Sequence, residues 1–359
     1  MEQLTELGFY ALAGHSDRPQ DLLHEVRRAE ELGLGSVFVS ERFNLKDAST
    51  LCGAAAASSR TLGIATAATN HNTRHPLVTA TFATTMHRLS AGRFALGLGR
   101  GFDALFRSMG LQPVTSAQLQ DAAIILRRLW AGETIVDYRG PLGTFPRLHQ
   151  DSEFRERIPL MLVAIGERTL ELAGACMDGV VLHTFLGDEA LVSSVEAVRH
   201  GAERAGRDPS SVRVWSVLAT VGDHVDEDSR HMKTVGRMAS YLRGYGRLLV
   251  DANGWDPAVL DRFLSDPFVR GFQGAFDARS TRADLDYLAT LIPDGWLAAA
   301  AVGTPEQCVA TITSQFELGA DSVILHGATP DELAPIVDTY RRSRPLHATG
   351  MPANPGWSR

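Results

Sequence analysis

A polar run with high hydrogen-bonding capacity follows one of the apolar segments of this sequence. The stretch Ile64–Pro76 reads IATAATNHNTRHP, so that a buried strand would end in Thr69, Asn70 and His71, followed by Arg74. Hydroxyl, amide, imidazole and guanidinium groups together supply donors and acceptors, and imidazole also exchanges a proton near neutral pH. Such a run can hold a polar ligand, although a solvated loop would have a similar composition.

Comparable side chains follow other apolar runs, at positions where strands would end. They are Ser40-Glu41-Arg42, Gly99-Arg100-Gly101, Gly166-Glu167-Arg168, His183-Thr184 and His326-Gly327. Each group alone is as compatible with a loop or a helix cap as with a binding site. Their repetition at the same relative position favours a single ligand-binding rim.

The glycines in these groups have two interpretations. The run GLGRG at 97–101 lacks the GxGxxG spacing and does not follow the first strand, so it gives only a weak dinucleotide signal. Glycines at a strand end do allow a flat ligand to lie against the main chain. Gly166, Glu167 and Arg168 begin a predicted helix, where unpaired N–H groups attract a phosphate, but a plain strand-to-helix turn fits equally well.

Composition and spacing argue against several other classes of protein. The twelve histidines show neither HxH nor HExxH spacing, and the three cysteines show no CxxC spacing, so no metal site is predicted. A formal net charge of −7 without a long basic run disfavours nucleic-acid or membrane partners. No leader or membrane-spanning segment is evident. We expect a soluble cytoplasmic protein that acts on a small molecule.

The elements that must position these side chains are short apolar runs that alternate with longer segments of helical period. This alternation is typical of βα units and a parallel sheet. We predict eight strands, at Leu7–Leu12, Ser36–Ser40, 62–69, 93–99, 159–166, 179–185, 212–222 and 322–327.

Eight such units favour an α/β fold of the (β/α)8 TIM-barrel class, because no Rossmann fingerprint opens the first unit. An open α/β sheet with two domains is the alternative. We predict one barrel domain over 1–344, with an inserted hairpin or loop at about 132–158 and a helical insertion at about 225–300. The last residues, 345–359, carry prolines and glycines and are predicted to form a flexible tail.

Taken together, several segments resemble a known family. IATAATNHNTRHP, RLSAGRFALGLGRG, IPLMLVAIGERTLELAGACMDGVVL and GTPEQCVATITSQFELGADSVIL are similar to the bacterial luciferase-like superfamily. The similarity extends from about residue 6 to residue 343. The segment TN...RHP favours the branch of oxidoreductases that depend on the deazaflavin coenzyme F420, whereas the other segments mark only the superfamily.

The resemblance implies a particular arrangement around the cofactor. A bulge with a non-prolyl cis peptide bond is expected at Ala67-Ala68, against one face of the cofactor ring, with Thr69 and Asn70 beside it. The other implied contacts are Glu41 and Arg42 for the ring, Gly99, Arg100 and Gly101 for the ring and its side chain, and the N–H groups of Gly166, Glu167 and Arg168 for the phosphate.

The implied chemistry is hydride transfer between the deazaflavin and a carbon of a small organic substrate, with a protein group that handles the proton. Alcohol-oxidising members of the family have a histidine after the acidic residue at the end of the second strand. Here Arg42 stands in that place, and arginine stays protonated at neutral pH. The candidates for proton transfer are therefore Glu41, His71 and His183, each of which also has an ordinary structural interpretation.

Three further expectations complete this prediction. The insertion at 225–300 is a candidate lid, and the substrate is apolar if Phe263, Phe268, Phe272 or Phe276 faces it, although core packing is the commoner role of such residues. A monooxygenase that uses reduced FMN, and a non-catalytic flavin-binding relative, are the alternative functions. A homodimer is expected from the family.

Overall fold

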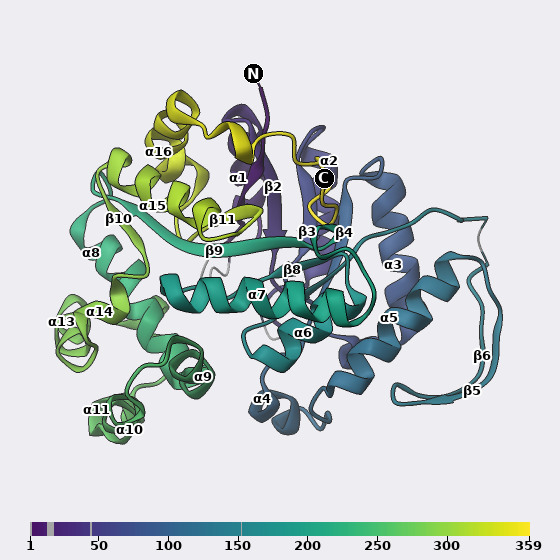
Figure 1. The fold of residues 1–359 in the computed structure, drawn as a ribbon. Helices are drawn as coiled ribbons and strands as arrows, with labels where there is room; N and C mark the ends of the chain where they lie inside the picture. Colours follow the sequence, from purple (N-terminus) through teal and green to yellow (C-terminus); the bar gives the residue numbers. More distant parts are fainter. Residues whose placement is uncertain (1, 13–17, 44, 152) are drawn as a thin grey trace.

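Eight parallel strands close into a barrel in the computed structural model, which describes residues 2–12, 18–43, 45–151 and 153–359. Around the barrel the order is β1-β2-β3-β4-β7-β8-β9-β11, and β11 pairs with β1. Because β8 also pairs with β9, the eight strands form a closed ring, so the predicted TIM barrel is confirmed and the open sheet is excluded (Figure 1). The strands are β1 (Leu4–Tyr10), β2 (Leu34–Val39), β3 (Gly63–Thr66), β4 (Phe94–Gly99), β7 (Leu160–Val163), β8 (Gly179–Val181), β9 (Arg213–Gly222) and β11 (Ser322–His326).

Outside the helical insertion, nine helices in the described part of the chain follow the barrel strands. They are α1 (Asp21–Glu31), α2 (Ala48–Ser58), α3 (Pro76–Leu89), α4 (Asp103–Ser108), α5 (Ser116–Trp130), α6 (Glu167–Cys176), α7 (Asp188–Arg204), α15 (Pro305–Glu317) and α16 (Pro330–Ser343). The strands are buried on both faces, because these helices cover the outside and a second apolar cluster fills the inside. Burial on both faces explains why the strands read as continuous apolar runs.

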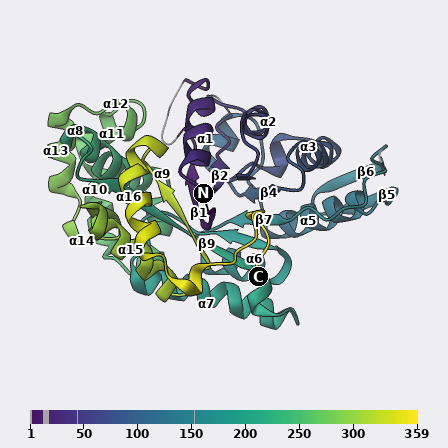
Figure 2. The ribbon, with the colours of Figure 1, turned by 90° about the horizontal axis from the view of Figure 1, so that it is seen from above.

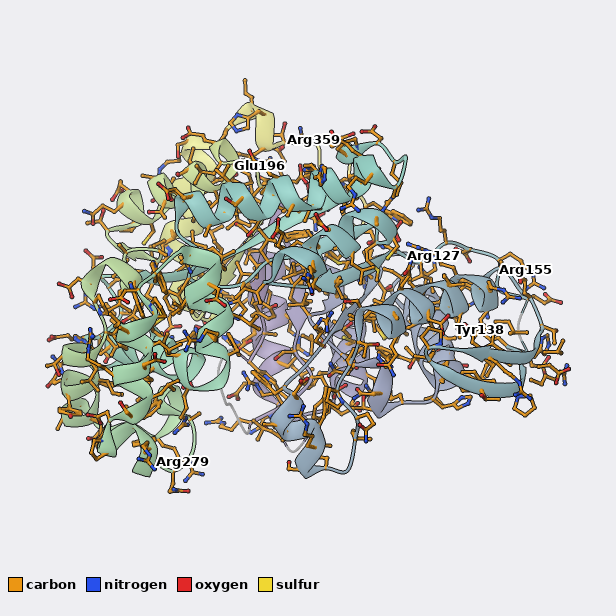
Figure 3. The ribbon with its side chains drawn as sticks, turned by 60° about the horizontal axis from the view of Figure 1, so that its bottom comes forward. Arg127, Tyr138, Arg155, Glu196, Arg279 and Arg359 are labelled. Carbon is orange, nitrogen blue, oxygen red and sulfur yellow. The ribbon has the colours of Figure 1, made fainter. Side chains whose placement is uncertain are left out.

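The predicted hairpin insertion is present as β5 (Ile135–Gly140) and β6 (Gly143–Leu148), an antiparallel pair that projects from one side of the barrel (Figures 1 and 2). Tyr138 ties it to the barrel, because the hydroxyl of Tyr138 donates to the carboxylate of Asp121 on α5. Figure 3 views the opposite end of the barrel from Figure 2 and shows this hairpin, with Tyr138 labelled, on one flank.

The helical insertion lies on the opposite flank of the barrel, where Arg279 is labelled in Figure 3. Its helices are α8 (Glu227–His231), α9 (Arg237–Asn253), α10 (Pro257–Ser265), α11 (Pro267–Gly271), α12 (Phe276–Arg279), α13 (Arg282–Leu291) and α14 (Asp294–Leu297). A short strand, β10 (Ala301–Gly303), returns the chain to β9. Helix α9 lies between the rest of the insertion and the barrel (Figures 1 and 2).

The last residues differ from the predicted flexible tail. The amide of Asn354 donates to the backbone carbonyls of Gly92 and Phe94, at 2.7 and 2.9 Å. The indole N–H of Trp215 donates to Pro355 O at 2.7 Å. These partners lie at the amino ends of the strands, so the tail packs across that end of the barrel, which we call the floor. Proline and glycine content did not reveal these contacts, because they depend on strands far away in the sequence.

Within the part of the chain that the structure describes, no helix combines the length and apolar character needed to cross a bilayer.

Candidate active site

Most of the side chains singled out above lie at the carboxyl ends of the barrel strands, which we call the mouth; Arg100 and His71 are the exceptions. The mouth has two chemically different halves. The ends of β2, β3, β4 and β7 present alanines, glycines and short polar groups, and we call them the small-residue half. The ends of β8, β11 and β1 present His183, His326 and Tyr10, which Tyr241 and Tyr245 of α9 approach. We call this second set the aromatic half.

The centre of the small-residue half is the end of β3. The peptide bond between Ala67 and Ala68 is cis, at the position that the resemblance implied. Beyond it, Thr69 N donates to Gly97 O at 3.0 Å and Gly99 N donates to Thr69 O at 2.9 Å. A side chain on Gly99 would begin 2.9 Å from the Ala68 methyl group, so the two strand ends approach as closely as these residue types permit.

Glu41, after β2, holds the segment that follows β3, and both of its carboxylate oxygens accept hydrogen bonds. One carboxylate oxygen accepts from Ala48 N at 3.0 Å. The other accepts from the Thr69 hydroxyl at 2.9 Å and from the Arg74 guanidinium at 2.5 Å, while the side chain is only 3% exposed. The backbone N–H of Glu41 also donates to Ala68 O at 3.1 Å. These contacts support the structural interpretation of Glu41, as the ion-pair partner of Arg74, more than a role in proton transfer.

Asn70 and Gly101 shape the loop that follows β4. The Asn70 amide donates to Gly99 O at 2.6 Å. Gly101 has a φ of +67°, which glycine adopts without steric cost, and a Cβ there would meet the Phe106 ring at 2.4 Å. A cleft of about 550 Å³, bordered by Arg74 and Met109 among other residues, opens beside this half of the mouth.

Arg100 turns away from the mouth and joins the start of α5 to the start of α6. Its guanidinium donates to the Thr169 hydroxyl at 3.2 Å, to Val114 O at 2.9 Å and to the Ser116 hydroxyl. At that helix start, Gly166 is the N-cap residue and no side chain in the described structure caps it. The first N–H groups of α6 are thus available to an anion, and the Glu167 and Arg168 side chains are exposed around them.

His71 lies outside the barrel. It borders a small apolar cavity with Pro76, Leu98 and Leu126, in the layer between β4 and the surrounding helices. Burial lowers the pKa of His71 to about 4, so the ring is neutral at physiological pH. This position separates His71 from the mouth and gives it a packing role.

Replacement of His71 by Asn is expected to change the acid sensitivity of the fold. The unfolded chain binds a proton at His71 below about pH 6.5, whereas the folded chain does so only near pH 4. The free energy of unfolding of the wild type should therefore fall as pH is lowered through this window. With allowance for partial solvent exposure, the loss between pH 7 and pH 5 should be about 1 kcal/mol smaller in the variant. Urea unfolding at pH 7 and pH 5 measures this loss of unfolding free energy. The matched control is His200→Asn, because His200 is exposed. Equal losses in the wild type and in His71→Asn would contradict the assignment of His71 as a buried, neutral histidine.

In the aromatic half, His183 and Tyr245 form a defined hydrogen-bonded pair. His183 Nδ1 lies 2.8 Å from the backbone carbonyl of Thr184, and a carbonyl can only accept, so Nδ1 carries the proton. Nε2 therefore accepts from the Tyr245 hydroxyl, at 2.6 Å. Burial lowers the pKa of His183 to about 4 and raises the pKa of Tyr245 well above its usual value, so both groups are neutral at pH 7.

His326 and Tyr241 continue the aromatic half. The Thr184 hydroxyl lies 2.8 Å from His326 Nδ1, and the Tyr241 ring lies parallel to the His326 ring with centroids 6.5 Å apart. Burial, followed by the charge of Arg237, lowers the pKa of His326 well below its usual value. Burial raises the pKa of Tyr241, and the charge of Arg42 opposes this rise; the same charge contributes to the lowered pKa of His326. Arg42 thus lies within electrostatic reach of the aromatic half.

Helix α9 reaches across the mouth at Tyr245. This residue has non-helical dihedral angles (φ −153°, ψ 33°) and interrupts the helix. Its ring stacks on Phe102, which follows β4, with centroids 5.3 Å apart. One tyrosine therefore contacts both halves of the mouth.

The sequence did not single out Tyr241 and Tyr245, which belong to the helical insertion. Their spacing of four residues places them on one helix face, and this was the available signal. The phenylalanines considered there do not reach the mouth: Phe268, Phe272 and Phe276 pack on one another, and Phe263 is buried in the main core cluster. These phenylalanines therefore pack in the core, which was the commoner of the two roles considered for them, and do not face a substrate.

A comparison with models of known protein families identifies the family of this chain. Residues 5–322 match the family described as luciferase-like monooxygenase. The chain belongs to this luciferase-like family. The match includes all the barrel strands except the first residue of β1 and most of β11, and it covers the small-residue half and all of the aromatic half except His326.

Among curated relatives of this luciferase-like chain, the 5,10-methylenetetrahydromethanopterin reductase of Methanolobus tindarius is 27% identical over 315 residues, which cover 86% of the chain and 90% of the reductase. The F420-dependent glucose-6-phosphate dehydrogenase of Amycolatopsis mediterranei is 25% identical over 344 residues, with 90% and 93% covered.

Solved structures show the same fold. The coenzyme F420-dependent tetrahydromethanopterin reductase of Methanopyrus kandleri superposes with a TM-score of 0.76 at 19% identity, over 94% of this chain and 97% of that one. An F420-dependent secondary alcohol dehydrogenase, in complex with an F420–acetone adduct, superposes with a TM-score of 0.69 at 21% identity, over 95% and 98%.

Proposed function

We propose that this luciferase-like protein is an F420-dependent oxidoreductase that transfers a hydride to or from a small organic substrate. The observation that carries the proposal is the relative named as F420-dependent glucose-6-phosphate dehydrogenase, which aligns over 90% of the chain. The two F420-dependent structures that superpose over nearly the whole barrel agree with it. The residues of the mouth provide an independent test of fit.

The small-residue half suits a flat, anionic cofactor. Ala68 and Gly99 leave room for a ring against the main chain, and the uncapped start of α6 offers N–H groups for a phosphate. We assign the ring to Glu41, Arg42, Ala67, Ala68, Thr69, Asn70, Gly99 and Gly101, and the phosphate to Gly166, Glu167 and Arg168 with Arg100 as their support. When bound, F420 supplies a two-electron hydride carrier, because it has carbon where a flavin has its central nitrogen.

His183 remains as the candidate for proton transfer among the three residues considered, now together with Tyr245. Glu41 is already occupied by three donors, and His71 lies outside the barrel. The Tyr245 hydroxyl lies at the mouth, and its proton points to His183 Nε2. A substrate hydroxyl can pass its proton to the Tyr245 oxygen while His183 accepts the tyrosine proton, and the reverse sequence protonates a substrate oxygen.

Replacement of Tyr245 by Phe is expected to lower kcat about 100-fold, because the hydroxyl that moves the proton is lost while the ring that stacks on Phe102 stays. The measurement is F420-linked turnover of the first alcohol or carbonyl compound that a screen identifies. Tyr287→Phe, in the same insertion but exposed, is the matched control. A Tyr245→Phe enzyme with wild-type kcat would remove the pair from the mechanism.

The decisive experiment is an equilibrium titration of the purified, cofactor-free protein with F420 and, separately, with FMN, followed by the fluorescence of each ligand. Tight binding of F420 and weak binding of FMN is the expected result. The Gly99→Leu variant should lose F420 affinity, because its Cβ would stand 2.9 Å from the Ala68 methyl group and would displace the end of β3. The exposed and unobstructed Gly110 provides a control position, as Gly110→Asn. A preference for FMN would move the protein to the reduced-FMN monooxygenases, and binding of a flavin without any turnover would indicate a non-catalytic carrier.

A homodimer is part of the proposal. A dimer interface on the hairpin flank is supported by exposed apolar side chains on α3, α5 and the hairpin. They are Val78, Leu89, Ile124 and Val136. Light scattering of the purified protein decides between a monomer and a dimer.

A further inference from the structure

His326, the last residue of β11, faces the mouth from inside the barrel. Side chains alternate along a strand, and Ile324 belongs to the apolar cluster inside the barrel, whereas Leu325 belongs to the cluster outside it. The side chain of His326 therefore points inward, above Ile324. The same alternation on β8, with Val181 in the inner cluster, directs His183 inward. The two histidines thus reach the same space from two strands.

Thr184 contacts both histidines but holds them differently. Its backbone carbonyl accepts from His183 Nδ1 at 2.8 Å, which fixes the proton of His183 on that nitrogen. Its hydroxyl lies 2.8 Å from His326 Nδ1. A hydroxyl donates or accepts according to the rotation of its hydrogen, so this contact is compatible with a proton on either nitrogen of His326. His183 is therefore held in one tautomer, whereas His326 has access to both.

The second nitrogen of His326 is left for a ligand. Burial lowers the pKa of His326 well below its usual value, so the ring is neutral at pH 7 and carries one proton. The side chain is only 8% exposed, and among the described residues the hydrogen bond found for the ring is the one to Thr184. Buried polar groups are generally hydrogen-bonded, so a partner for Nε2 is indicated. A neutral imidazole offers that partner an N–H or a lone pair, according to its tautomer.

We propose that His326 Nε2 binds the oxygen on the reacting carbon of the substrate, in both redox states of that carbon. A carbonyl oxygen would accept from Nε2–H while the Thr184 hydroxyl donates to Nδ1. An alcohol hydroxyl would donate to unprotonated Nε2 while Nδ1–H donates to Thr184. The proposal rests on the hydride transfer proposed above and names its substrate class, a pair of alcohol and carbonyl compound.

The contact with His326 complements the proton transfer at Tyr245. During reduction, hydride from the reduced cofactor bonds to the carbonyl carbon, the π electron pair moves to the oxygen, and Tyr245 delivers the proton to that oxygen. The carbonyl compound is reduced and the cofactor is oxidised; alcohol oxidation reverses each step. Nε2–H would stabilise the negative charge that develops on the oxygen before the proton arrives.

The direct test is NMR of the histidine ring nitrogens in labelled protein, with cyclohexanone and, separately, cyclohexanol as probes. Cyclohexanone is added with oxidised F420 and cyclohexanol with reduced F420, so that neither probe can react. The proton of His326 is expected on Nε2 with cyclohexanone and on Nδ1 with cyclohexanol. His183 should keep its proton on Nδ1 in both samples and is the internal control. The same tautomer of His326 with both probes, or no saturable change in its signals, would overturn the proposal.

Turnover tests whether the contact matters for catalysis. His326→Phe removes both nitrogens but keeps a ring, and it should lower kcat about 100-fold, as is typical for loss of one donor at a developing oxyanion. His326→Gln should recover part of this loss, because an amide can also donate or accept. His200→Phe is the matched control, because His200 is exposed on α7. F420 affinity should stay at the wild-type level in all three variants, and wild-type kcat in His326→Phe would contradict the proposal.

Two further arms keep the result interpretable. If the His326 variants do not fold, Thr184→Val, which removes only the hydroxyl partner, identifies the His326 signals by their change. If F420 does not bind, the spectra of the cofactor-free protein with both probes still report the tautomer of His326. Failure of the cofactor assignment is thereby separated from failure of this contact.

Discussion

Replacement of Glu41 by Gln is expected to lower the free energy of unfolding by about 3 kcal/mol, because a buried ion pair loses its charge and one acceptor becomes a donor. The carboxylate of Glu41 accepts from Ala48 N, from the Thr69 hydroxyl and from Arg74. The single oxygen of an amide cannot accept from all three donors. The residues after β3, Thr69 and Arg74, therefore lose part of their hydrogen bonding to the residue after β2. For a chain of 359 residues this loss corresponds to a decrease of about 4 °C in Tm.

Thermal and urea unfolding of the Glu41→Gln and Arg74→Met variants, alone and combined, measure the effect and the coupling between the two residues. The matched control is Glu133→Gln, which removes a carboxylate that is 49% exposed and paired with Arg128. This experiment also separates the two roles considered for Glu41. A Glu41→Gln protein with wild-type stability but without turnover would restore Glu41 as the group that handles the proton.

Replacement of Arg213 by Met should have a still larger effect, a loss of about 4 kcal/mol or more. Arg213 is fully buried at the floor, where its guanidinium donates to Ser322 on β11 and to Thr5 O on β1. It also donates to three carbonyls of the tail, namely Pro352 O, Asn354 O and Trp357 O. The variant would leave these acceptors buried and unpaired, so the floor and the tail should loosen together.

The Arg213 prediction is measured by unfolding and by limited proteolysis, in which the variant should be cleaved within 350–359 faster than the wild type. Arg204→Met provides the control, since Arg204 is 65% exposed and contacts Glu171 at 3.5 Å. Wild-type stability in the Arg213→Met protein would show that the tail contacts contribute little.

The barrel could be predicted from the sequence because its signal is local. Each strand is a short run buried on both faces, and helices follow with recognisable starts such as Thr304-Pro305, where Thr304 and Gln307 cap each other's backbone N–H groups. The hairpin and the helical insertion were equally visible as interruptions of this alternation. Strand β10 was not predicted, because three residues at the end of an insertion carry no periodic signal.

The site could be predicted only in part, since a position at a strand end does not fix the direction of a side chain. Arg100 and His71 both follow strands, yet Arg100 turns toward α6 and His71 faces an apolar cavity outside the barrel. His183 was found because it follows the end of β8, one residue beyond Leu182. Tyr245 was not, because its place at the mouth depends on a helix interruption and on packing against Phe102. Contacts between segments distant in the sequence decided each of these cases.

The packing of the tail across the floor completes the closure of one end of the barrel. Pro355 is held by Trp215 and the tail carbonyls are held by Arg213, next to the apolar cluster that fills the inside of the barrel. The barrel is a packed core and not a channel, so cofactor and substrate would both arrive and leave at the mouth, where α9 lies.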